Sequence, residues 1–191
     1  QKAVRSLELN VDGLRLRELA SWTNEQLEEI LVQPDDRRFF AILELLRRDI
    51  TIEAIHEKTK IDPYFLKEMK ELIELERNVQ TTWTFEKITS DQLLTLKQAG
   101  FTNSWLEKQW NCLQGEVKQK LTDFNLTPTY AKIVAYSDDL NEDAAYYYTT
   151  WQKGTYEATP KVKEKVLMVG SGPIQIGQGI EFDYCSVHVV L

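Results

Sequence analysis

Between residues 24 and 113 the sequence changes repeatedly from a helix-capping residue to a short amphipathic segment and then to a helix breaker. Asn24 precedes the first such segment, and Pro34 ends it. Asp62 followed by Pro63 is a strong helix start, because aspartate accepts from free backbone N–H groups and proline fits the first helical position. The apolar positions at helical spacing are Leu27, Ile30, Leu31, Phe39, Phe40, Ile42, Leu43, Leu45, Leu46, Ile52, Ile55, Phe65, Leu66, Met69, Leu72, Ile73 and Leu75. The pattern predicts a mainly α domain in which each helix buries one face.

Two stretches of this region are similar to each other. Thr51 to Leu66 and Thr89 to Leu106 each run from a polar cap through a short amphipathic helix to an apolar residue, a second helix start and an aromatic-leucine pair. In the second stretch Ser90 begins the helix and Gly100 ends it. The next helix is marked by Trp105, Leu106, Trp110 and Leu113. We interpret the two stretches as a degenerate repeat, so the domain is expected to consist of packed helical hairpins.

The C-terminal residues 165 to 191 have a different pattern. An apolar run from Val166 to Val169 stops at Gly170, which is typical of a strand covered on both faces. After a glycine-rich loop, Ile180, Tyr184, Val187 and Leu191 fall on one helical face with no stop signal after them. A strand and a helix alone cannot bury this much apolar surface, so we expect the chain to be a fragment of a longer protein.

The loop from Gly170 to Gly179 fits neither of the two common phosphate-binding loops. The dinucleotide fingerprint needs a third glycine where this chain has Gln175, and the P-loop needs a lysine where it has Gln178. The residues alone leave two alternatives open, phosphate binding and a conformational role for glycines that permit positive φ.

As a whole string, GSGPIQIGQGIEFDYCSVH from residue 170 closely resembles the opening of the second synthetase half of the carbamoyl-phosphate synthase large subunit. The resemblance implies the first strand, loop and helix of an α/β preATP-grasp domain, with the glycine loop beside the parent active site. The residues that this implies for the loop site are Gly170, Gly172, Pro173, Gly177, Gln178, Gly179, Glu181 and Asp183.

The resemblance extends toward the N-terminus. QKAVRSLE at residues 1 to 8 is similar to the last helix of the first synthetase half, and IDPYFLKEMKELIELE at residues 61 to 76 is similar to the helical oligomerisation domain that joins the halves. The implied domains are the end of the first half at 1–15, the helical oligomerisation and linker domain at 16–160, and the truncated start of the second half at 161–191.

One stretch departs from the family pattern. The family usually has Asp-Thr-Cys where this chain has Val134-Ala135-Tyr136, so a polar contact made by that tripeptide would be lost. The tyrosine-rich segment 145–151 again resembles the family. Residues 127–160 are broken by prolines and acidic pairs, and we assign them no regular structure.

Composition excludes several classes of protein. The net charge of −7 leaves no basic surface, which argues against nucleic acid as a partner. No apolar run approaches the roughly 20 residues that a membrane helix needs, and the start has no signal-peptide pattern, so a cytoplasmic location is expected. Cys112 and Cys185 are too few for a disulfide framework and are expected to be buried or spectator thiols.

The sequence predicts no catalytic or metal-binding constellation. His56 lies among charged residues, where a solvated side chain is expected rather than a general base, and His188 has no second ligand at metal-binding spacing. Glu181 and Asp183 would not share a helical face. For Trp105 and Trp110 a place in the core is expected, with an interface anchor as the alternative.

By resemblance, the parent enzyme makes carbamoyl phosphate from bicarbonate, glutamine-derived ammonia and two MgATP, together with a glutaminase small subunit. This segment would join the two synthetase halves, mediate a homo-oligomer contact through its helices, and be inactive alone with no cofactor of its own. The alternatives are a free-standing helical adaptor and a nucleotide-binding oxidoreductase, although the latter needs a complete doubly wound sheet. The sequence does not distinguish a pyrimidine-pathway from an arginine-pathway enzyme.

Overall fold

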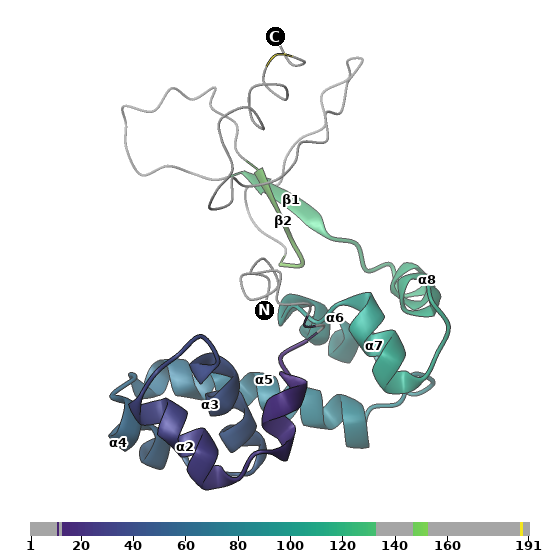
Figure 1. Cartoon of the computed structure of the whole chain (residues 1–191). Helices are drawn as coiled ribbons and strands as arrows, with labels where there is room; N and C mark the ends of the chain where they lie inside the picture. The colour runs from purple at the N-terminus through teal and green to yellow at the C-terminus, as the bar shows by residue number, and fades with distance from the viewer. Residues whose placement is uncertain (1–10, 12, 133–146, 153–187, 189–191) are drawn as a thin grey trace. The chain divides into compact units, whose positions relative to one another are not determined.

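The computed structural model describes residues 11, 13–132, 147–152 and 188. The chain divides into two compact units, residues 1–157 and 158–191. The described part of the first unit consists of helices and a two-stranded sheet (Figure 1), which confirms the mainly α prediction. The predicted strand, glycine loop and helix of residues 165–191 lie outside the described residues apart from His188, and so do residues 134–136.

The helices begin where local capping chemistry allows. The helical elements are the 3-10 turn η1 (Arg17–Ser21) and the α-helices α2 (Asn24–Val32), α3 (Arg38–Arg47), α4 (Ile52–Thr59), α5 (Pro63–Thr81), α6 (Ser90–Gln98), α7 (Asn103–Trp110) and α8 (Glu116–Asp123). Threonine side chains accept from the first free N–H groups of four helices, at Thr23, Thr51, Thr89 and Thr102. The prediction that Asn24 caps α2 was wrong by one residue, since Thr23 and Gln26 form a capping box there.

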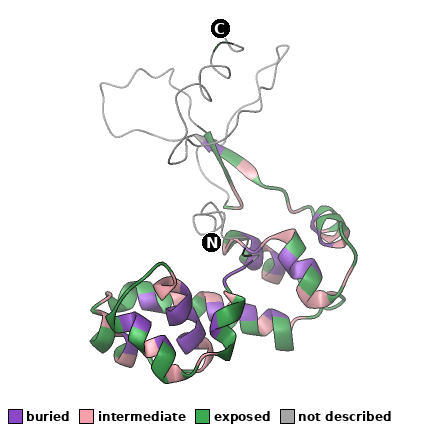
Figure 2. Cartoon of the chain, in the orientation of Figure 1, coloured by how far each residue is buried: buried purple, intermediate pink, exposed green. Residues whose placement is uncertain are grey.

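The first hydrophobic core, core one, lies among α2, α3, α4 and the first half of α5. Its buried residues are Leu14, Leu19, Leu27, Ile30, Leu31, Phe40, Ala41, Ile42, Leu43, Leu45, Leu46, Ile55, Leu66 and Ile73. Every residue from Phe40 to Leu46 is buried, so α3 is the central helix of this core (Figure 2). A helix in which seven successive residues are buried needs neighbours on all sides, and α2, α5 and η1 supply them.

The second hydrophobic core, core two, lies among the second half of α5, α6, α7 and α8. Its buried residues are Val79, Ile88, Leu93, Leu96, Phe101, Trp105, Leu106, Val117 and Leu121. Because α5 places Leu66 and Ile73 in core one and Val79 in core two, this 19-residue helix is common to both.

The predicted repeat is present in the structure. Each copy has a threonine-capped helix, a residue with positive φ, an apolar residue, a new N-cap and a second helix; the residues with positive φ are Lys60 and Gly100. In both copies a basic side chain near the end of the first helix lies within hydrogen-bond distance of the apolar residue's carbonyl oxygen. His56 Nδ1 is 2.7 Å from the oxygen of Ile61, and Lys97 Nζ donates to the oxygen of Phe101 over 2.8 Å.

Three local predictions need correction. Leu113 is not part of α7, because the helix ends at Trp110 and Asn111 adopts positive φ; the Leu113 side chain is 75% exposed. Helix α8 was not predicted, since its turns carry only two buried apolar residues, Val117 and Leu121. The region 127–160, to which we assigned no regular structure, contains two short strands.

These strands, β1 (Thr129–Lys132) and β2 (Tyr147–Thr150), form an antiparallel pair. The register places Ala131 opposite Tyr148. Just after β2, Trp151 packs against core two, its backbone oxygen accepts from Gln98, and its ring lies 5.5 Å from Lys97 Nζ. Trp151 therefore ties the β pair to the helices.

Candidate functional site

The residues predicted to surround the glycine loop lie outside the described part of the structure. They are Gly170, Gly172, Pro173, Gly177, Gln178, Gly179, Glu181 and Asp183, and their role stays a prediction.

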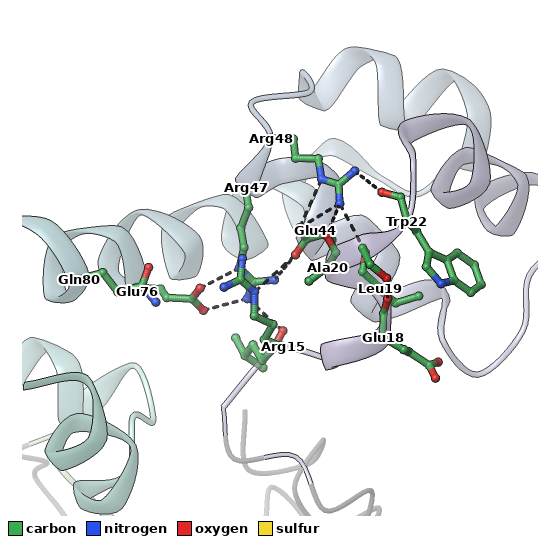
Figure 3. A network of polar contacts seen from close by, with 12 residues as sticks. Arg15, Glu18, Leu19, Ala20, Trp22, Glu44, Arg47, Arg48, Glu76 and Gln80 are labelled. Atoms are coloured by element: carbon green, nitrogen blue, oxygen red, sulfur yellow. Dashed lines mark hydrogen bonds and ion pairs between the residues drawn. The ribbon is translucent and has the colours of Figure 1, made fainter. Parts of the chain in front are cut away.

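Within the described residues, the most developed polar arrangement is a buried ion network at the side of core one (Figure 3). Arg47 of α3 makes a bidentate pair with Glu76 of α5, with Nε to Oε1 at 2.7 Å and Nη2 to Oε2 at 2.8 Å. Its Nη1 also reaches Glu44 Oε2 at 3.4 Å. The Arg47 side chain is 9% exposed and both carboxylate side chains are 6% exposed. These buried ion pairs hold α3, the central helix of core one, against α5, the helix that both cores share.

The same arginines hold the segment that precedes α2, residues 13–22, which we call the connector. Arg47 Nη2 donates to the carbonyl oxygen of Leu14 over 3.0 Å, and Arg48 Nη1 donates to that of Trp22 over 2.7 Å. Arg48 Nη2 also donates to the oxygen of Ala20. Backbone carbonyl groups need donors, and at Leu14, Ala20 and Trp22 the arginine side chains supply them. The network therefore fixes the connector against core one along most of its length (Figure 3).

The connector also contacts core two, through Gly13. A Cβ atom at this position would lie 2.7 Å from Trp105 Nε1 and 2.8 Å from Trp105 Cδ1. Trp105 is 7% exposed and packs on Phe101, with ring centroids 4.8 Å apart. Trp105 is thus a core residue of this chain, as expected, and its cover is the backbone of the connector. Trp110 is half-buried and donates to the carbonyl oxygen of Trp83 over 2.6 Å.

The chemistry of this network favours positioning over catalysis. Arginine stays protonated in proteins, so it cannot exchange a proton with either carboxylate. The contacts are bidentate and saturated by carbonyl groups, which fixes geometry and leaves no nucleophile beside a base. Among the described residues, no group of three His, Cys, Asp or Glu side chains could hold a metal ion.

A hollow of about 640 Å³ lies beside the network, between the connector, α5 and α7. Its lining residues are Val11, Arg15, Leu16, Arg17, Glu18, Glu76, Gln80, Trp105, Lys108 and Gln109. Both charge signs line it, and its inner acid, Glu76, is already paired with Arg47. The hollow therefore has no clear preference for an anion or a cation.

The structure describes the surroundings of three residues that the sequence singled out. His56 was expected to be solvated, but it is half-buried and its Nδ1 contacts the carbonyl oxygen of Ile61, so that expectation was wrong. Burial, followed by the charges of Glu116 and Glu107, raises the pKa of the Cys112 thiol. His188 is exposed.

Sequence reasoning missed the ion network, although it left a signal. Glu44 interrupts the apolar run of α3, and Glu76 stands three residues from both Ile73 and Val79 on the buried face of α5. Charged residues are almost never fully buried unless they are paired. An acid on each of two apolar faces, with arginines at 47 and 48, could have indicated a buried pair.

Comparison with known proteins identifies the family. The family described as carbamoyl-phosphate synthetase large chain, oligomerisation domain, matches residues 1–125, and the carbamoyl phosphate synthase preATP-grasp domain matches residues 162–191. This chain belongs to the carbamoyl-phosphate synthetase large-chain family. The resemblance inferred from the sequence motifs is confirmed, and the helical unit described above corresponds to the family's oligomerisation domain over the matched residues.

Individual large chains match along the whole sequence. The chain is 47% identical over 98% of its length to the carbamoyl phosphate synthase arginine-specific large chain of Halalkalibacterium halodurans, and 43% identical over all of its length to that of Geobacillus stearothermophilus. It is 36% identical over 99% of its length to the carbamoyl phosphate synthase large chain of Methanothrix thermoacetophila. It spans 18% of the first two relatives and 17% of the third.

Among the described residues, no helix is both long enough and apolar enough to cross a bilayer.

Proposed function

We propose that this chain is the segment of a carbamoyl-phosphate synthase large chain that joins the two synthetase halves and sets their relative orientation. The observation that carries the proposal is the order of the family matches, with the oligomerisation domain at 1–125 followed by the preATP-grasp domain at 162–191. A segment with that order stands between the first half and the second.

The described structure supports an orienting role. The connector is held by Arg47 and Arg48 on core one and by Trp105 on core two, and α5 runs through both cores. A connector fixed at several points transmits orientation, whereas a flexible linker would only limit distance. The buried contacts of Glu44 and Glu76 are therefore positioning contacts.

The parent would make carbamoyl phosphate from bicarbonate, glutamine-derived ammonia and two MgATP, with a glutaminase small subunit as partner and a cytoplasmic location. Two of the relatives above are named arginine-specific, which favours the arginine pathway over the pyrimidine pathway. The glycine loop from Gly170 to Gly179 would lie beside the second active site. The segment alone would carry no ATP-grasp domain and would be inactive.

The orienting role is tested in the full-length large chain. Residues 23–126 are replaced by a Gly/Ser linker long enough to span the same distance, and the intact chain serves as control. We expect carbamoyl phosphate synthesis to be lost while each half keeps its own ATP-dependent step. Undiminished synthesis through a flexible linker would contradict an orienting role.

A titration of the 191-residue chain with MgATP tests the predicted inactivity. Calorimetry should show no saturable heat, because Gln178 stands where a P-loop lysine would reach the phosphates. Micromolar binding would show that this segment contains a nucleotide site of its own.

Subunit association is the second part of the proposal. If it occurs through the helices between about residues 20 and 125, light scattering should give a mass that rises with protein concentration. A strictly monomeric mass at high concentration would contradict subunit association, and only the joining role would then remain. A free-standing adaptor would instead be expressed without the synthetase halves, so the full reading frame distinguishes it.

A further inference from the structure

The first turn of α5 exposes two adjacent aromatic residues that the folding of the described chain does not use. Tyr64 is 63% exposed and Phe65 is 56% exposed, and their rings meet edge to face with centroids 5.4 Å apart. Pro63 before them is exposed as well, and the exposed residues Lys67 and Glu68 follow on the same helix. We call Pro63, Tyr64 and Phe65 the α5 aromatic patch. A compact apolar patch beside charged residues is typical of a contact surface.

The internal repeat shows what covers such a position in this fold. Phe65 stands three residues after the N-cap Asp62, and Trp105 stands three residues after the N-cap Thr102. The next residue, Leu66 or Leu106, is 0% exposed in both copies. The leucine is therefore buried in both hairpins, whereas the exposure of the aromatic residue before it differs between them.

At that aromatic position the second copy is covered and the first is not. Trp105 is 7% exposed, and the backbone of the connector lies against it at Gly13, at a distance that leaves no room for a Cβ atom. Gly13 and Leu14 reach this place as a bend outside any helix, and Gly13 has φ +99°. In the second hairpin, the segment that lies on the aromatic residue is therefore a non-helical bend with a glycine at the point of contact.

We propose that the α5 aromatic patch docks a second non-helical, glycine-containing segment, supplied by the same large chain from outside these 191 residues. The inference rests on the proposed function, since it needs the remainder of that chain. The chain spans only 18% of its relatives, so most of the polypeptide that could supply the cover lies elsewhere.

The size of the patch favours the same chain over a second copy. Aromatic side chains bury roughly 150–250 Å² each, whereas a stable interface between separate molecules buries about 800 Å² on each partner. Two partly exposed rings and a proline fall well short of that area. A segment of the same polypeptide needs less, because its covalent connection gives it a high effective concentration.

Photo-cross-linking in the full-length large chain tests the proposal. The photoreactive residue p-benzoylphenylalanine is placed at position 65, the protein is irradiated, and the linked peptides are mapped by mass spectrometry. We expect a defined intrachain cross-link to a glycine-containing peptide outside residues 1–191, with a yield that does not change on dilution. The control position is Leu113, which is 75% exposed in the same unit and should give only background.

Other outcomes overturn the inference. A product with the mass of two large chains that falls on dilution would assign the patch to a second copy, and a link to the glutaminase subunit would assign it to that partner. Equal background at 65 and 113 would show a solvated patch. These outcomes leave the proposed function intact if the same preparation makes carbamoyl phosphate. Loss of synthesis in the unmodified protein would instead refute the proposed function.

A second variant separates docking from folding. In the 191-residue chain, Tyr64→Ser with Phe65→Ser should leave the melting temperature nearly unchanged, because both side chains are exposed. In the full-length chain the same variant should lose protection from hydrogen exchange over the first turns of α5. A large fall in the melting temperature of the 191-residue chain would show that the pair belongs to the fold, which overturns the inference.

Discussion

Gly13 is held by two independent constraints, a backbone conformation and a close contact. Its φ is +99°, and a Cβ atom would meet the Trp105 ring at 2.7 Å. Gly115 has nearly the same conformation, with φ +96°, but no atom lies within 4 Å of its Cβ position. The two glycines can therefore be compared directly, because they share a backbone conformation and only Gly13 also has a close steric contact.

We expect Gly13→Ala to destabilise the fold more than Gly115→Ala. Both changes place a side chain in the left-handed region, which costs about 1–2 kcal/mol. The change at Gly13 adds an overpacking cost of about 1–3 kcal/mol against Trp105. Urea unfolding of the two variants measures the difference. Equal losses of unfolding free energy would contradict a contact between the connector and core two.

Cys112 should be an unreactive thiol near neutral pH. Burial raises its pKa, and the charges of Glu116 and Glu107 add to the shift, so the thiolate fraction is below that of a free cysteine. In a Cys185→Ser variant, iodoacetamide should alkylate the folded chain more slowly than the chain unfolded in urea, and the rate should rise as pH increases. Glu116→Gln should increase the rate. Faster alkylation in the folded state than in urea would contradict the raised pKa.

At the scale of elements, the contact between α3 and α5 depends on a buried ion pair. Glu76→Gln keeps the shape of the side chain but removes the carboxylate that pairs bidentately with Arg47. Among the described residues, only Glu44, at 3.4 Å, then still offsets the Arg47 charge. Because a buried charge that loses its main partner is costly, we expect a loss of unfolding free energy of up to about 3–5 kcal/mol, the cost of a fully broken buried pair. The comparison variant is Asp49→Asn, which removes a carboxylate 75% exposed and paired with Arg77 of α5.

Asp49→Asn should lower the unfolding free energy by no more than about 1 kcal/mol, because exposed ion pairs are screened by water. Urea unfolding at two salt concentrations checks both variants. The cost at Glu76 should be almost insensitive to salt, since the pair is shielded from solvent. Similar small losses for the two variants would show that the Arg47 network does not hold α3 against α5.

How much of the fold could be predicted from the sequence depends on how far apart along the chain the interacting residues lie. The starts of α4, α5 and α6 were predicted because Thr51, Asp62 and Thr89 act on N–H groups within three residues of themselves. The β pair was missed because its strands are four residues long and join positions about twenty residues apart. Helix α8 has too few apolar residues for its periodicity to stand out.

The site shows the same limit. Arg47 meets Glu76 across 29 positions and Leu14 across 33, distances over which periodicity carries no information. Within the sequence, only Glu44 and Glu76, each on an apolar helix face, indicated the network. The glycine loop was recognised because the whole string resembles a family, whereas its isolated glycines left phosphate binding undecided.

At the scale of the whole molecule, the described contacts that stabilise the helical unit end at Trp151. Core one and core two are built from residues between Val11 and Trp151. That tryptophan packs against core two and also contacts Gln98 and Lys97 of α6. The chain also divides into compact units at residue 157. Two truncations can therefore separate the part that the helices need from the part that belongs to the next domain.

A chain ending at residue 160 should keep the melting temperature of the 191-residue chain within a few degrees, because it keeps both described cores. A chain ending at residue 128 should melt lower, since it loses Trp151 and leaves Lys97, which is 8% exposed, without the ring above it. Calorimetric melting of the three chains measures both effects, and circular dichroism confirms that each remains helical. If the chain ending at residue 160 unfolds, residues 161–191 are part of the helical unit and the predicted boundary at 160 is wrong.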